Sequence, residues 1–352
     1  MVATNEPHVV QRLRRVRRLG WTYAASVVTP MLLWLACSSS SATSERHEVS
    51  HDGHPEAHEL LGDMDAPAWA APLEQPWPRW THAARGRPTV IRFGYEPFAE
   101  QDRFDINAQR ISRLEAQRDG ASVSYVRRIR EARIRIVDLN DDGGIATAEV
   151  YFERDDARIH SGDDEAREDS PVAGKRYLCH VAGNRIHVEQ VAPEAKTVEE
   201  SRERILVWRA VRPVVRGQRL AQALAARPQP VDKPLELSFS HLAPLVGADR
   251  HWYTESVETR FLGSATVDEQ EAAVLHLEVH ARVAGQGGTI QTVELTGNVA
   301  LDKRSGFPLR TELSFATHVE SASIDTSVAS THADVFGEHR VRTQTAFRRA
   351  PE

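Results

Sequence analysis

Residues 275–283, LHLEVHARV, carry an apolar side chain at every second position. The apolar members, from Leu275 to Val283, alternate with histidine, glutamate and arginine. Because successive side chains of a β-strand point to opposite faces, this spacing predicts a strand with one buried face and one wet face. The segment therefore belongs to an antiparallel sheet that is apolar on one side.

The same alternation recurs on both sides of this strand. Residues 293–301 and 309–319 repeat it, and residues 257–261 and 341–347 are expected to flank the set. The stretches Asp302–Gly306 and Gln286–Gly288 contain the glycines and polar residues of tight turns. Consecutive hairpins of this kind predict an antiparallel meander.

Earlier in the chain, further strands are predicted and are followed by helices. The strand segments are residues 90–95, 104–114, 123–137, 145–152, 177–181 and 185–191. Thr197 is a candidate N-cap with Glu200 three residues later, and residues 220–226 suit a second short helix. We therefore expect an α+β fold that is mainly β: a curved antiparallel sheet covered by one or two short helices.

Composition divides the chain into three parts. Residues 1–36 contain a basic stretch followed by an apolar stretch, residues 37–87 are rich in Ser, Pro and His, and residues 88–350 carry the strand patterns. The middle part lacks a sustained apolar period, so we expect a disordered tether. The body is expected to form one β-rich domain, with possible halves at 88–192 and 235–350 and the helices between them.

The N-terminal part has the pattern of an export signal. Five arginines between Arg12 and Arg18 precede an uncharged stretch from Trp21 to Ala36, and Cys37 follows directly. This pattern resembles the lipobox of bacterial lipoproteins, in which the cysteine is diacylated and becomes the new N-terminus. The resemblance implies a signal peptide at 1–36, a lipid anchor on Cys37 and, with Ser38 next, an outer-membrane location facing the periplasm or the surface. A plain secretory signal or an uncleaved anchor is the alternative.

The order of strands, central helices and long meander resembles the half-barrel of periplasmic lipoprotein carriers and of uncharacterised envelope lipoproteins. The net charge is −6, and without the arginine-rich first 36 residues it is about −10. An acidic body argues against a nucleic-acid partner, because phosphate binding needs a basic surface. The body contains a lone cysteine, Cys179, which we interpret as a buried structural thiol.

Residues 138–149, DLNDDGGIATAE, match the calcium-binding loop of an EF-hand. The candidate calcium ligands are Asp138, Asn140, Asp142, Gly144 through its carbonyl, and Glu149. The flanking residues, however, alternate like strands rather than like amphipathic helices. The alternatives are a calcium site and an acidic hairpin turn.

A second group of candidate metal ligands lies in the tether. His47, His51, His54 and His58 are candidates for a loose transition-metal site, and residues 47–51 match the zinc-protease pattern HExxH. No apolar segment is available to bury a helix there, so a solvated linker is the preferred interpretation.

Apart from the HExxH match in the tether, the chain has no GxSxG, P-loop or dinucleotide-binding glycine pattern, and we predict a non-enzymatic protein. The leading hypothesis is a lipid-anchored envelope protein whose curved sheet binds a lipid, a lipoprotein or another envelope protein. The alternative is a calcium-binding module that uses residues 138–149. A hydrolase whose catalytic residues converge from distant strands is a third class of function. No cofactor other than calcium is expected.

Overall fold

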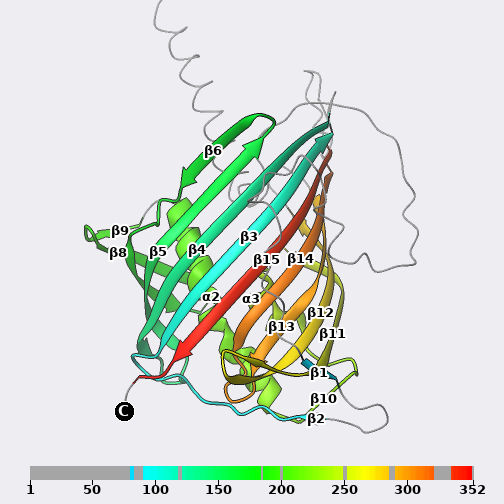
Figure 1. Ribbon diagram of the computed structural model, residues 1–352. Helices are drawn as coiled ribbons and strands as arrows, with labels where there is room; N and C mark the ends of the chain where they lie inside the picture. Colours follow the sequence, from blue (N-terminus) through cyan, green and yellow to red (C-terminus); the bar gives the residue numbers. More distant parts are fainter. Residues whose placement is uncertain are drawn as a thin grey trace, which may run out of the picture.

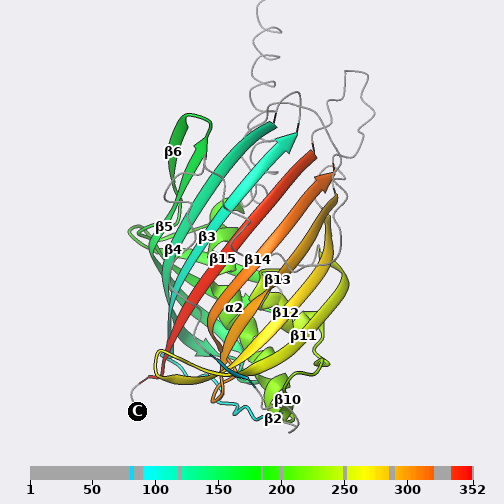
Figure 2. The same ribbon diagram turned by 45° about the vertical axis from the view of Figure 1, so that its right-hand side comes forward.

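The computed structural model describes residues 80–82, 90–117, 121–183, 185–198, 201–248, 252–284, 290–320 and 334–350. They form a mainly β protein in which one antiparallel sheet of thirteen strands curves around two helices (Figures 1 and 2). The sheet is open, with β1 and β9 at the two ends of its strand order. The predicted fold class is therefore confirmed.

The strands follow one another along the sheet in an order that differs from the chain order. This order is β1 (Trp80–His82), β11 (Trp252–Val267), β12 (Gln270–Ala284), β13 (Ile290–Asp302), β14 (Pro308–Glu320), β15 (Asp334–Arg348), β3 (Arg103–Gln117), β4 (Ala121–Leu139), β5 (Ile145–Ser161), β7 (Arg176–Ala182), β8 (Arg185–Ala192) and β9 (Lys196–Thr197). The remaining strand, β6 (Asp164–Asp169), pairs with β5 alone. A separate small sheet pairs β2 (Val90–Ile91) with β10 (Gln229–Pro230).

The strands before and after the helices belong to this one sheet because β15 pairs with β3. The two strands run antiparallel from the Arg103–Arg348 pair to the Gln117–Asp334 pair. No register shift occurs between β14, β15, β3 and β4, and their long strands lie side by side in Figure 1. Directly opposite residues therefore share a face, and alternate positions on each of these strands point toward the helices.

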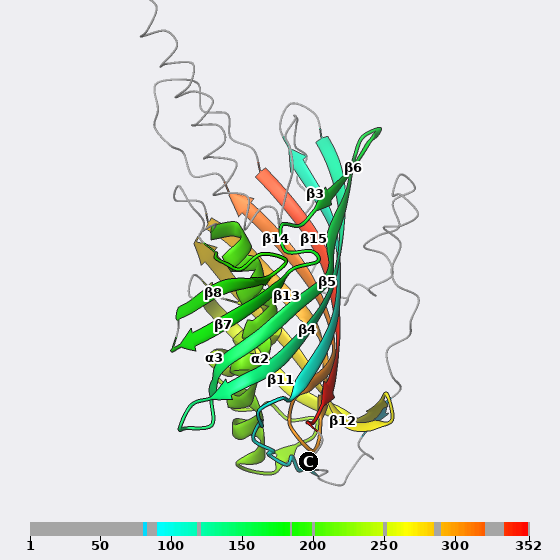
Figure 3. The same cartoon turned by 90° about the vertical axis from the view of Figure 1, so that its left-hand side faces the viewer.

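Helix α2 (Ser201–Ala225) lies across the concave face of the sheet (Figure 3). Its N-terminal end is held by Glu203, whose Oε1 accepts hydrogen bonds from the Tyr177 hydroxyl at 2.5 Å and from Lys175 Nζ at 3.1 Å. Leu206, Val207 and Val211 on this helix are buried against the sheet. This one-sided burial keeps the helix on the concave face.

The helical expectations need correction in three respects. Thr197 lies in β9 and does not cap a helix, and one continuous helix of 25 residues replaces the two short ones. This helix continues through Pro213 because its buried face packs on the sheet along its length, and tertiary packing outweighs the low helix propensity of one proline. A further helix, α3 (Phe239–Val246), was not expected from the sequence.

The core is divided into two main clusters beneath the curved sheet. One lies between β3–β8 and the N-terminal half of α2, and the other lies between β11–β14, the C-terminal end of α2 and α3. Leu206 belongs to the first cluster, and Leu220 and Leu242 belong to the second. The space between the two clusters is only partly filled, as described below.

Several smaller expectations are also tested. Residues 80–82, at the end of the predicted tether, pair with β11 as strand β1. The predicted turn before β14 is present: Gly306 has a φ of 72° and donates a backbone hydrogen bond to the Asp302 carbonyl at 2.8 Å. The turn at 286–288 lies outside the described residues. Within the described segments, neither helix has the length and apolar character needed to cross a membrane.

Candidate ligand cavity beneath the sheet

A cavity of about 260 Å³ lies between the concave face of the sheet and helices α2 and α3. Its lining comes from strands near both core clusters and from both helices. Figure 3 shows how the two helices stand on this side of the curved sheet. The cavity therefore occupies the space that the two core clusters leave open.

One wall of the cavity is apolar and is formed mainly by β12, β13 and β14. Val283, Val293, Leu313 and Phe315 line it from these strands. They point inward because they occupy the inward positions of the period-two alternation that was evident in the sequence. Pro244, Leu245 and Val246 of α3 complete this wall.

The base of the cavity is closed by Phe307. Its ring lies 5.1 Å from that of Phe104 and 5.7 Å from that of Phe98, measured between centroids. The same ring approaches α2 at Gly217, where a Cβ atom would lie 2.5 Å from Phe307 Cε2. Glycine is therefore required at this point of the helix for the ring to seal the base.

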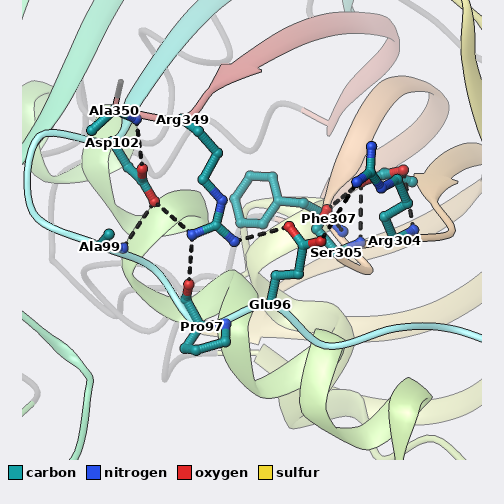
Figure 4. A network of polar contacts seen from close by, with 10 residues as sticks. Glu96, Pro97, Ala99, Asp102, Arg304, Ser305, Phe307, Arg349 and Ala350 are labelled. Atoms are coloured by element: carbon teal, nitrogen blue, oxygen red, sulfur yellow. Dashed lines mark hydrogen bonds and ion pairs between the residues drawn. The ribbon is translucent and has the colours of Figure 1, made fainter. Parts of the chain in front are cut away.

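A polar network below this aromatic cluster ties both ends of the body together (Figure 4). Arg349 donates to the Pro97 carbonyl and to Glu96 Oε2, both at 2.9 Å, and lies 3.5 Å from Asp102 Oδ2. Asp102 also accepts hydrogen bonds from the backbone N–H groups of Ala99 at 2.9 Å and Ala350 at 3.1 Å. The network links the segment before β3 to the segment after β15, and none of these residues lines the cavity.

The opposite wall of the cavity is strongly basic. Arg110 of β3 and Arg128 of β4 are directly opposite each other in the register, and Arg130 lies two residues further along β4 on the same face. Arg209 and Arg212 of α2 are three residues apart, so they lie on one side of the helix, and both line the cavity. Among the described lining residues there are five arginines and one histidine, and no aspartate or glutamate.

Asp155 of β5 compensates part of this charge from the neighbouring strand, where it lies directly opposite Arg130. Its carboxylate is fully buried and accepts hydrogen bonds from Arg128 Nε at 2.9 Å, Arg130 Nη2 at 3.0 Å and the Ser170 hydroxyl at 2.8 Å. Burial raises the pKa of Asp155, but Arg130 and Arg128 outweigh it and hold the pKa below its ordinary value. Asp155 is therefore an anion that orients two of the five guanidinium groups.

The pKa values of two further groups indicate that the charges of this wall lower the stability of the folded protein. Burial, together with the charges of Arg209 and Arg128, lowers the pKa of Arg110 to about 9. Burial and the nearby charge of Arg110 lower the pKa of His339 well below its usual value, so this imidazole is neutral at pH 7. Like charges are gathered here although folding alone would favour apolar side chains.

Nε of Arg130 and Nδ1 of His339 are buried at this wall and have no hydrogen-bond partner in the part of the chain that the structure describes. Both residues line the cavity. His339 Nε2 lies 3.1 Å from the Thr317 hydroxyl, which itself donates to the Gly337 carbonyl. Buried polar atoms are usually satisfied, so these two indicate a place where a ligand atom completes the structure.

The loop predicted as a calcium site forms the hairpin turn between β4 and β5. Asp138 lies within β4 and Glu149 within β5, so strands flank the loop where an EF-hand requires helices. The Gly144 carbonyl accepts the Asn140 N–H at 2.7 Å, and Asp142 Oδ1 accepts the Gly144 N–H at 3.0 Å. Two of the five candidate ligands thus already accept hydrogen bonds within the turn.

Glu149, the expected bidentate ligand, faces two arginines. Its carboxylate forms ion pairs with Arg135 and with Arg176, the latter at 3.5 Å. In the part of the chain that the structure describes, no three His, Cys, Asp or Glu side chains are grouped to hold a metal ion. The structure thus favours the hairpin turn over the calcium site.

The other candidate sites divide between described and undescribed residues. Cys37 and the tether histidines at 47, 51, 54 and 58 lie outside the described residues. Cys179 lies in β7 and is fully buried, and burial raises the pKa of its thiol to about 12. The interpretation of Cys179 as a structural thiol is confirmed.

The basic wall was missed in the sequence, although a signal was present. Arg128 and Arg130 have the same parity in β4 as Ala132, Ile134 and Ile136, which are all buried. Alternation therefore places these two arginines on the core face of the strand. An arginine at a core-facing position is unusual and marks a candidate site.

Fold and cavity together define a class: an open, curved β-sheet protein with a cavity beneath the sheet that is lined by both apolar and cationic side chains. No protein-family model matches the chain, and no curated protein matches its sequence. Among solved structures, it is similar to one of lipid–protein interactions in lipovitellin, with a TM-score of 0.34 and 7% identity. That match covers 72% of this chain and 26% of the lipovitellin chain, so this chain spans about a quarter of its length. It is also similar to an outer membrane channel from Pseudomonas putida F1, with a TM-score of 0.20 and 9% identity over 72% of this chain and 98% of the channel chain.

Proposed function

We propose that this chain is a cell-envelope lipoprotein that binds an apolar chain, such as that of a lipid, in the cavity beneath its sheet. The lipobox-like segment ending at Cys37 supports the envelope location and the lipid anchor. The apolar wall supports the ligand class, because an apolar surface inside a cavity favours a ligand that leaves water. The protein holds its ligand without converting it.

The observation that carries this proposal is that the curved sheet does not have a filled interior. A scaffold or pure interaction domain is expected to pack its core to the density of an organic crystal. Here the sheet and helices α2 and α3 leave about 260 Å³ lined on one side by aliphatic and aromatic groups. Each methylene group buried there would contribute about 0.8 kcal/mol to binding.

Native mass spectrometry of the gently extracted full-length protein tests this function, and so does the fluorescence of N-phenyl-1-naphthylamine, an uncharged apolar probe. We expect an additional small-molecule mass and saturable probe binding. The variant Val293→Trp should abolish both, because Val293 lines the cavity and an indole would fill part of it. Its matched control is Glu294→Trp on the next residue of β13, which is exposed and points to the other face.

Circular dichroism establishes that both variants are folded, and the smaller replacement Ala108→Leu serves if the tryptophan at 293 is not accommodated. The proposal is refuted if the extracted protein carries no small molecule and the wild type binds no probe. It is also refuted if folded Val293→Trp and Glu294→Trp bind the probe equally well.

A further inference from the structure

The basic wall of the cavity is not needed to hold an apolar chain. Five arginines line it, and no carboxylate does so among the described lining residues. Asp155 of the neighbouring strand β5 pairs with Arg128 and Arg130. The lining therefore suits an anionic group, and arginine is the residue that binds phosphate and carboxylate oxygens in a bidentate manner.

Buried atoms at this wall are placed to contact the anion. The Thr317 hydroxyl lies 3.3 Å from the Gly337 carbonyl and 3.1 Å from His339 Nε2, both within hydrogen-bond distance. The other ring nitrogen of His339, Nδ1, has no hydrogen-bond partner among the described residues. Arg130 Nε is a donor with no partner at the same wall.

A ligand that completes this wall must offer several acceptor oxygens to the guanidinium groups. A phosphate monoester meets this need, since it carries a charge of about −1.5 to −2 at pH 7 and three acceptor oxygens. A carboxylate or a sulfate monoester carries a single negative charge at pH 7. An alcohol carries no charge.

The size of the cavity limits the rest of the ligand. Sites for drug-sized ligands have volumes of about 300–1,000 Å³, and the 260 Å³ here lies just below that range. The volume suits one chain beside the apolar lining residues, which include Val283 and Phe315. Arginines and apolar side chains line the same cavity, so a single molecule reaches both.

We propose that the cavity binds a phosphate monoester at the end of a single alkyl or acyl chain, with Arg110, Arg130, Arg209 and His339 contacting the head group. This inference rests on the proposed function and specifies its ligand. The charges gathered around Arg110 are then the consequence of a binding site that is completed by its anion.

Competition with the fluorescent probe on the full-length protein tests the head group. Decyl phosphate, decanoate, decanol and inorganic phosphate are compared at pH 7 and at constant ionic strength. We expect decyl phosphate to bind at least tenfold more tightly than decanoate or decanol, and inorganic phosphate to compete weakly because it lacks the chain. Charge-assisted hydrogen bonds of this kind have the strength to produce such a ratio.

The variant Arg209→Gln and its matched control Arg133→Gln test whether the head group binds at the arginines of the cavity. Arg133 is an exposed arginine of β4 that pairs with Glu153 on the outer face, away from the cavity. We expect Arg209→Gln to reduce the affinity for decyl phosphate about tenfold and to leave decanol binding unchanged, whereas Arg133→Gln changes neither.

The outcomes separate the two proposals. If decanol and decanoate bind as tightly as decyl phosphate, the head-group inference is wrong and the proposed function stands. If inorganic phosphate competes as well as decyl phosphate, the site binds a free anion and the chain is not part of its ligand. If none of the compounds competes and no probe binds, the proposed function fails as well. The wild-type comparison decides among these outcomes even where a variant does not fold.

Discussion

Replacing Asp155 with asparagine should strongly destabilise the protein while preserving the shape of the side chain. The carboxylate is fully buried and bonded to Arg128 at 2.9 Å, Arg130 at 3.0 Å and Ser170 at 2.8 Å. The amide of the variant cannot balance the charges of the two guanidinium groups. Removing one partner of a buried ion pair costs about 3–5 kcal/mol, because the remaining charge stays buried.

The pH dependence of this loss has a definite sign. The pKa of Asp155 lies below its ordinary value in the folded protein because Arg130 and Arg128 outweigh the effect of burial. An aspartate in the unfolded chain titrates near pH 4, at about 3.9. The stabilisation is therefore fully present above about pH 4 and is lost as the pH falls through the folded pKa. The stability difference between wild type and Asp155→Asn should shrink over that range.

Urea unfolding followed by far-ultraviolet circular dichroism measures the effect at pH 7 and at several lower values. The control is Glu153→Gln in the same strand, whose exposed ion pair with Arg133 contributes at most about 1 kcal/mol. The reasoning is wrong if Asp155→Asn costs no more than this control. It is also wrong if the difference between wild type and Asp155→Asn stays constant as the pH falls below 4.

Three further predictions concern other parts of the body. Cys179 should resist alkylation at pH 8 in the native protein and react once urea unfolds it, because burial raises the pKa of its thiol to about 12. Peptide mass spectrometry measures the labelling, and rapid labelling of Cys179 in the native protein would contradict this prediction. Gly297→Ala should lower stability by about 1–3 kcal/mol, since its Cβ would lie 2.2 Å from the Glu312 carbonyl oxygen, whereas the exposed neighbour Thr296→Ala should change it by less than about 0.5 kcal/mol. Calorimetric titration with millimolar calcium should give no heat of binding at the turn 138–149, because Glu149 already forms ion pairs with two arginines. A binding signal that disappears in Asp138→Ala would instead show that the turn is a calcium site.

The strands were predictable where one face of a strand is wet and the other is dry. Residues 275–283 lie within β12, and residues 293–301 lie within β13, because alternating burial imposes alternating sequence. β6 was missed because it pairs with β5 alone and its residues, DEARED, are mostly charged. Without a buried face, a strand leaves no periodic signal.

For the helices, the local sequence predicted the wrong lengths. Pro213 and Gly217 interrupt the local helix propensity of α2, so the sequence favoured two short helices. The apolar side chains on both sides of that segment pack in the two core clusters, and this packing sustains one helix. The site follows the same logic: the arginines of β3 and β4 were visible, but their meeting with Arg209 of α2 depends on contacts between segments about a hundred residues apart.

The sequence by itself determined the class of fold and the two-faced character of each long strand, because those properties arise from side-chain spacing within a segment. It also contained the export pattern that ends at Cys37. Only the tertiary structure decided that β15 pairs with β3, that the two strand sets form one curved sheet, and that an apolar wall faces five arginines across a shared cavity. The physical reason is that register and curvature are properties of the assembled sheet, and no local pattern records which distant face a side chain will meet.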